Sequence, residues 1–118
     1  MINIFARKIG SMICKWILEE KKVKKDLEGL NEILKMLFSE LDKLEIKDVK
    51  FQYSSTMLNG KLVTKSKCPI YKYYPPWCEK GCIEFISTFT RTFNRRINVE
   101  RIKKQPESDF CEFEFRIK

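Results

Sequence analysis

The chain of 118 residues contains no histidine, and this absence excludes several familiar kinds of active site. Histidine serves as a general base near neutral pH, as the partner of a serine or cysteine nucleophile and as a zinc ligand. Catalysis in this chain would therefore rest on a bound metal or on a cysteine thiolate. The sequence pattern places no pair of carboxylates for acid–base chemistry. We therefore assign no catalytic residue and favour a binding or sensor domain over an enzyme.

A long apolar run is absent as well. Near the start of the chain, Arg7, Lys8 and Lys15 interrupt the apolar residues, so no stretch approaches the ~20 apolar residues of a membrane span or the core of a signal peptide. We therefore expect a cytoplasmic protein without a membrane span. The apolar residues of this segment lie mostly on one helical stripe, which predicts a helix packed on its own domain or on a second copy, with Cys14 as a buried small hydrophobe. Docking of this helix on a membrane surface or a partner is the alternative.

Positive charge is in excess. The chain has 24 lysines and arginines against 16 acidic residues, which gives a formal net charge of +8. Such a balance permits binding to nucleic acid, acidic membranes or acidic proteins, but only a clustered face would specify one of them. One basic and aromatic stretch covers residues 65–77, and a second basic cluster covers residues 91–104. The alternatives for the aromatic stretch are a docking surface for a larger complex and a lid over a ligand pocket, with nucleic-acid binding as the minor hypothesis.

The hydrophobic periodicity predicts an α+β domain over residues 1–118. Residues 1–45 contain two amphipathic segments and predict a helical hairpin. Residues 46–118 predict a ββαββ core, because alternating segments flank Asn59-Gly60 and recur before and after a polar turn near the end of the chain. Between the two hairpins, a central amphipathic helix should start near Trp77. We therefore expect an antiparallel sheet of about four strands flanking this helix.

Four cysteines are the candidate site residues. Cys68 ends the second predicted strand, Cys78 and Cys82 begin the central helix on the same face, and Cys111 lies on the inner face of the last strand. One end of the sheet would gather all four, which predicts a metal centre with an iron–sulfur cluster favoured over zinc. The spacing C-x9-C-x3-C-x28-C is nonspecific, however, and matches neither zinc knuckles nor the usual ferredoxin run. The alternatives are a redox-active cysteine pair and four reduced thiols packed in the core.

The cysteine-bearing segment also resembles a known family. The Cys-Pro step, the C-x3-C pair at a helix start, the returning INVERIKK stretch and the final CEFEF are similar to the C-terminal half of the L-2-amino-thiazoline-4-carboxylic acid hydrolase-like family and the related 4-vinyl reductase domain. The resemblance covers roughly residues 48–118. It implies an α+β sandwich that binds small hydrophobic ligands in sensor domains or trafficking subunits. Hydrolase activity transfers poorly, since the chain has no histidine to activate water.

Three functions follow from these observations. The first is a small cysteine-cluster protein that binds a metal centre for redox sensing or for sensing or carrying a small ligand. The second is a hydrolase resembling the thiazoline-carboxylate family, with Cys68 or Cys78 as nucleophile and Glu79, Glu84 or Glu100 in support. The third is an accessory subunit that docks on a larger complex or nucleic acid through its basic aromatic face. Each of them requires a protein partner, a second copy or a bound ligand.

Overall fold

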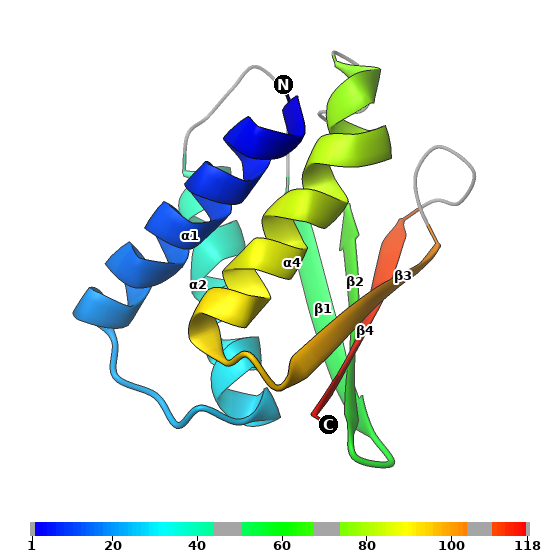
Figure 1. The fold of residues 1–118 in the computed structure, drawn as a ribbon. Coiled ribbons are helices and arrows are strands. Elements are labelled where there is room, and N and C mark those ends of the chain that lie inside the picture. Colours follow the sequence, from blue (N-terminus) through cyan, green and yellow to red (C-terminus); the bar gives the residue numbers. More distant parts are fainter. Residues whose placement is uncertain (1, 44–50, 68–73, 104–109, 118) are drawn as a thin grey trace.

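The helices and strands follow one another in the order that the periodicity predicts (Figure 1). The structure is a computed structural model, and it describes residues 2–43, 51–67, 74–103 and 110–117. Within these ranges, the α+β fold with a four-stranded antiparallel sheet is confirmed. The elements are α1 (Ile2–Glu20), α2 (Leu27–Asp42), β1 (Gln52–Leu58), β2 (Lys61–Lys67), the π-helical turn η1 (Trp77–Gly81), α4 (Cys82–Phe93), β3 (Ile97–Lys103) and β4 (Cys111–Ile117).

Two hairpins form the sheet, whose strands lie in the order β1-β2-β4-β3. Asn59 and Gly60 connect β1 to β2 with φ angles of 49° and 75°, the left-handed conformation that this dipeptide adopts in tight hairpin turns. In β4 the predicted alternation is confirmed, because Cys111, Phe113 and Phe115 are buried while the glutamates between them are only half-buried. The sheet therefore has one apolar face for the helices to cover.

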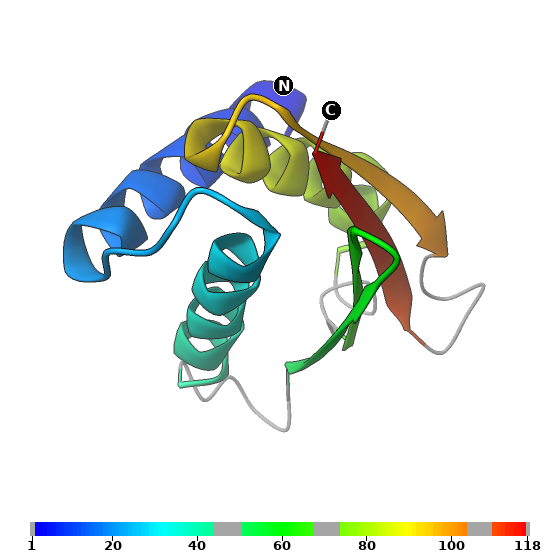
Figure 2. The same cartoon turned by 90° about the horizontal axis from the view of Figure 1, so that it is seen from below.

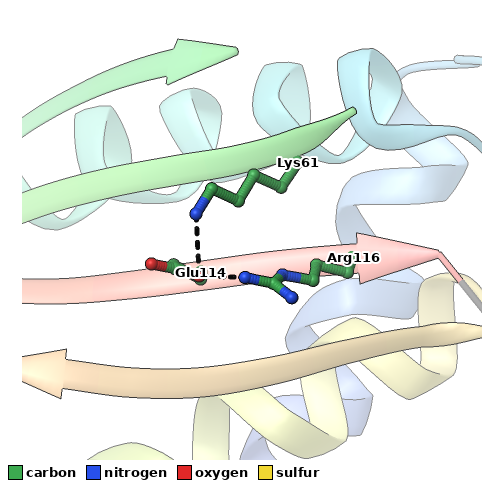
Figure 3. A network of polar contacts seen from close by, with 3 residues as sticks. All are labelled: Lys61, Glu114 and Arg116. Atoms are coloured by element: carbon green, nitrogen blue, oxygen red, sulfur yellow. Dashed lines mark hydrogen bonds and ion pairs between the residues drawn. The ribbon is translucent and has the colours of Figure 1, made fainter. Parts of the chain in front are cut away.

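The opposite face carries a small network of charged side chains from β2 and β4 (Figure 3). The Lys61 Nζ atom lies 3.3 Å from Oε1 of Glu114, and the Arg116 guanidinium donates to the same oxygen at 2.9 Å. Hydrogen bonds from Arg116 and then from Lys61 hold the pKa of the Glu114 carboxyl below its ordinary value. Ion pairs at the surface contribute little to the free energy of folding, so the sheet is stabilised mainly through its apolar face.

The helices form two groups on the apolar side of the sheet, with α1 and α4 together and α2 apart from them (Figures 1 and 2). α1 lies along α4, and α4 contacts β3, whereas α2 contacts β1, β2 and β4. The predicted pairing of the two N-terminal helices is therefore loose, because α1 packs mainly on α4 and only slightly on α2. Asp26 caps the start of α2 by accepting a hydrogen bond of 2.8 Å from the backbone N–H of Gly29.

Small residues let α1 approach α4 closely. Ala6, Gly10 and Cys14 are buried on α1, and a Cβ atom placed on Gly10 would lie 2.6 Å from the backbone oxygen of Phe85. At the edge of this contact, Arg7 Nε donates to Glu84 Oε2 at 2.7 Å. The face of α1 that packs on α4 is therefore a stripe of small residues.

The first helix packs on its own domain, as one of the predicted alternatives has it, but only part of its apolar stripe faces inward. Ile9, Ile13 and Ile17 pack into the core, whereas Ile4, Phe5, Met12 and Trp16 are exposed. Close backbone approach through the small residues decides which side of α1 faces the domain, and it turns these four residues outward. Among the helices of the described residues, none is both long and apolar enough to cross a membrane.

Replacing Gly10 with alanine is expected to destabilise the chain. The new methyl group would collide with the backbone of α4, and overpacking of this kind costs about 1–3 kcal/mol. The better helix propensity of alanine offsets up to about 1 kcal/mol of this. Urea unfolding should show a lower midpoint for Gly10→Ala, while Ser11→Ala, one position along the same helix, stays near the wild type. Equal stability of the Gly10→Ala and wild-type proteins would contradict this packing.

Candidate functional site

An apolar cavity lies between the sheet and the helices. Its volume is about 180 Å³, and its walls come from α1, α2, β1, β2, β4, η1 and α4. Segments from the beginning to the end of the chain therefore build one site. The lining residues are Ile9, Ile13, Leu34, Leu37, Phe38, Leu41, Phe51, Tyr53, Thr64, Ser66, Trp77, Cys78, Cys82, Phe85, Ile86, Cys111, Phe113 and Phe115.

Small side chains in two of the walls leave this space open. Thr64, Ser66 and Cys111 are buried on the strands, with Ser66 directly opposite Cys111 in the pairing of β2 with β4. The helical wall contributes Cys78 and Cys82. Protein interiors normally reach the packing density of organic crystals, so five small side chains at positions that face a core leave a void.

The turn η1 brings two cysteines to the same wall. Its π-helical geometry is shown by the backbone N–H of Cys82, which bonds to the carbonyl of Trp77 five residues earlier. The Arg101 guanidinium donates to the carbonyl of Cys78 at 2.6 Å and to that of Glu79 at 3.2 Å, which ties the turn to β3. Cys78 and Cys82 consequently both line the cavity.

Aromatic residues build the other walls. The Trp77 ring lies 5.9 Å from that of Phe85, and the Phe38 ring stacks on Tyr53 at 5.0 Å. The Tyr53 hydroxyl donates a hydrogen bond of 2.7 Å to Oδ1 of Asn31, so its polar end is satisfied outside the apolar space. Burial raises the pKa of Tyr53 above its ordinary value, because the charged phenolate is disfavoured away from water.

The lining is almost free of strong polar groups. The lining residues with polar groups are Tyr53, Thr64, Ser66, Trp77 and the three cysteines, and no lysine, arginine, aspartate or glutamate is among the described lining residues. Such a cavity favours a hydrocarbon ligand over a charged one, because an unpaired charge would be desolvated there. The site is therefore suited to hold an apolar chain or ring.

Three of the four predicted site residues meet at this cavity. Cys78, Cys82 and Cys111 line it, while Cys68 lies outside the described residues. The metal-binding interpretation is nevertheless corrected, because no group of three cysteine or carboxylate side chains in the described ranges is placed to hold a metal ion. The three thiols belong instead to the wall of an apolar cavity. A four-cysteine site that includes Cys68, and the choice of an iron–sulfur cluster over zinc, stay untested predictions.

The fifth cysteine has the structural role expected of it. Cys14 is fully buried between helices and does not line the cavity. Burial raises the pKa of its thiol to about 11, since the charged thiolate is disfavoured away from water. Cys14 therefore acts as a small core residue, as predicted.

The other predicted functional residues lie elsewhere. Glu84 is paired with Arg7. The hydrogen bond from Arg7 is the main reason why the pKa of the Glu84 carboxyl lies below its usual value. Neither Glu84 nor the other two candidate glutamates line the cavity. In the basic aromatic stretch, Lys65 lies over the Phe110 ring at 4.8 Å and Trp77 faces the cavity, whereas residues 68–73 lie outside the described ranges. A docking role for this face stays a prediction.

Sequence reasoning missed the contributions of the first two helices to the site. Ile9 and Ile13 of α1 and Phe38 of α2 line the cavity. The periodicity placed the two isoleucines only on a helix face and left Phe38 outside the apolar stripe of its helix. The signal that was available is the presence of small residues, Thr64 and Ser66 on β2 and Cys111 on β4, at the inward positions of the strands. Where small residues on the strands face a helical turn that also carries small residues, the core is left with unfilled space.

Comparison with known proteins yields one informative match. No protein-family model matches the sequence, and no curated protein matches it either. A solved structure shares the fold: a trafficking protein particle complex subunit 3 from Naegleria fowleri, covalently bound to palmitic acid. The match covers 99% of this chain and 78% of that chain, with a TM-score of 0.52 and 14% sequence identity. At that identity the likeness concerns the fold.

The resemblance to the thiazoline-carboxylate hydrolase-like and 4-vinyl reductase families is wrong. The structural neighbour is a subunit of a trafficking complex, which is a different family, and no family model supports the resemblance. The motifs that suggested it have another explanation, since Cys78, Cys82 and Cys111 line the apolar cavity. The hydrolase function inferred from that resemblance is withdrawn with it.

Proposed function

We propose that this chain is a non-catalytic subunit of a protein assembly and that its cavity binds a fatty acyl chain. The observation that carries the proposal is an apolar cavity with thiols in its wall, in a fold similar to that of a trafficking complex subunit covalently bound to palmitic acid. The absence of charged groups from the described lining supports binding of the hydrocarbon tail. The cytoplasmic location expected from the sequence remains a prediction.

The volume of the cavity limits the size of the ligand that it can hold without a rearrangement of its walls. A cavity of about 150 Å³ holds a benzene molecule in a small protein, and the present cavity of about 180 Å³ is slightly larger. A short segment of hydrocarbon chain therefore fits as the walls stand. A longer chain requires side chains in the wall to move, or it leaves its end outside.

The thiols add the possibility of covalent attachment. A Cys78, Cys82 or Cys111 thiolate that attacks the carbonyl of an acyl–coenzyme A thioester would form a new thioester and release coenzyme A as the leaving thiol. The thiol proton passes to solvent and then to the departing sulfur, so the exchange needs no other reactant. Covalent and reversible binding are distinguished by whether the acyl group survives denaturation.

Straight-chain fatty acids of increasing length test the proposal. Each buried methylene contributes about 0.8 kcal/mol, or roughly fourfold in affinity. We expect the affinity, measured by displacement of a fluorescent fatty acid, to rise by this factor per methylene and to level off once the cavity is full. Methyl esters should bind at least as well as the free acids, because the described wall offers no cation for a carboxylate. Binding that is weak, non-saturable or independent of chain length would exclude the acyl-chain function.

A further inference from the structure

One glycine near the cavity stands where the backbone does not require it. Gly81, the last residue of η1, has φ and ψ angles of −67° and −43°, which any residue adopts in a helix. Alanine is the better helix former at such a position, because glycine loses more conformational freedom on folding. The reason for a glycine here is therefore sought in the space around it.

The indole of Trp77 occupies the space that Gly81 leaves. A Cβ atom placed on Gly81 would lie 2.5 Å from Cε3 of this ring and 3.1 Å from its Cδ2 and Cζ3 atoms. Gly81 is buried but does not line the cavity, whereas Trp77 does. Of the four glycines of the chain, Gly81 is the one whose missing side chain makes room for a side chain of the cavity wall. The Trp77 ring is thus seated on the backbone of η1.

The seated ring forms an outer part of the cavity wall. Trp77 is half-buried, so part of its side chain faces the solvent, whereas Phe85, Phe113 and Phe115 of the same wall are buried. The Trp77 ring also has the largest side chain among the described lining residues. Loss or displacement of this ring would therefore extend the cavity outward, which a buried wall residue with further core behind it does not allow.

We infer that the Trp77 ring sets the length of the acyl chain that the cavity accepts, with Gly81 as the positioning residue that holds the ring in place. The inference rests on the proposed acyl-chain function. A chain that fills the space of about 180 Å³ meets the ring, and further methylenes remain outside the apolar wall and add no affinity. Without the ring, the same methylenes would be buried.

A series of straight-chain fatty acids, measured on variant proteins by displacement of a fluorescent fatty acid, tests the inference. The length limit is defined as the chain length beyond which the affinity of the wild type stops rising. In Trp77→Ala, a chain two methylenes beyond this limit should bind about 16-fold more tightly than the chain at the limit. In the wild type the two chains should bind equally. Trp77→Leu should give a smaller gain in the same direction, and it supplies the test if Trp77→Ala does not fold.

Gly81→Ala tests the seat of the ring. Its methyl group collides with the ring of Trp77 and changes no side chain of the wall, so the length limit should shift only because the ring moves. In the double variant with Trp77→Ala there is no ring to displace, so the limit should equal that of Trp77→Ala alone. A wild-type limit in Gly81→Ala, or a double variant that differs from Trp77→Ala, would overturn the inference.

Trp16→Ala is the matched control, because this tryptophan is exposed on α1 and lies outside the cavity wall. It should keep the wild-type limit. An unchanged limit in Trp77→Ala, with saturable binding by the wild type, would overturn the inference and leave the acyl-chain function standing. A wild type that binds no fatty acid of any length would overturn the proposed function and this inference together.

Discussion

Replacing Cys111 with phenylalanine is expected to abolish acyl-chain binding in a chain that still folds. Cys111 is 4% exposed on the inner face of β4 and lines the cavity, so a benzyl group at this position occupies the space of the ligand. Phenylalanine is favoured in strands, and Phe113 and Phe115 already stand on the same face. Displacing several methylenes at about 0.8 kcal/mol each should weaken binding by 100-fold or more.

The matched control is Cys111→Ala, which removes the same thiol but leaves the cavity open. This variant should bind fatty acids with an affinity close to that of the wild type. Circular dichroism and urea unfolding of both variants establish that the comparison is between folded proteins. Undiminished binding by Cys111→Phe would place the ligand outside the cavity, whereas equal loss in both variants would assign binding to the thiol alone.

Replacing Phe89 with alanine should produce a large loss of stability. Phe89 is fully buried in α4, its ring lies 6.1 Å from that of Phe85, and it belongs to the core shared by the helices and the sheet. Truncation of a buried phenylalanine to alanine costs about 3–5 kcal/mol, through lost burial and the cavity left behind. For a domain whose total stability is about 5–15 kcal/mol, this is a large fraction.

Urea unfolding followed by circular dichroism measures the effect. Phe89→Leu, which keeps most of the volume, should lose much less and keeps the test informative if Phe89→Ala does not fold. Arg91→Ala, at an exposed position of the same helix, should be close to neutral. A loss below about 1 kcal/mol in Phe89→Ala would contradict the packing of α4 at the centre of the core.

Local signals account for the parts of the fold that the sequence predicted. The Asn59-Gly60 turn, the strict alternation through CEFEF and the apolar steps from Cys78 to Phe93 are each determined by a few neighbouring residues. The inward direction of Cys111 follows from the same alternation. Periodicity of two or of 3.6 residues is thus sufficient to place the strands and helices and to assign the buried faces of β4 and α4.

Long-range packing determines what the sequence did not predict. The small residues Ala6 and Gly10 orient α1 by close approach to α4, although the bulky apolar residues of that helix suggested a different buried side. The cavity depends on small side chains from β2, β4 and η1 that meet only in the folded chain. The number of cysteines therefore suggested a metal centre, whereas the structure places three of them in the wall of an apolar cavity.

The central claim is that the cavity holds one acyl chain. Native mass spectrometry of the full chain with dodecanoate, set beside the Cys111→Phe protein under the same conditions, tests it most directly. We predict one bound chain per monomer of the wild type, saturable with ligand concentration, and no bound chain in the variant. Bound chains that accumulate without saturation, or equal binding by the two proteins, would contradict the account.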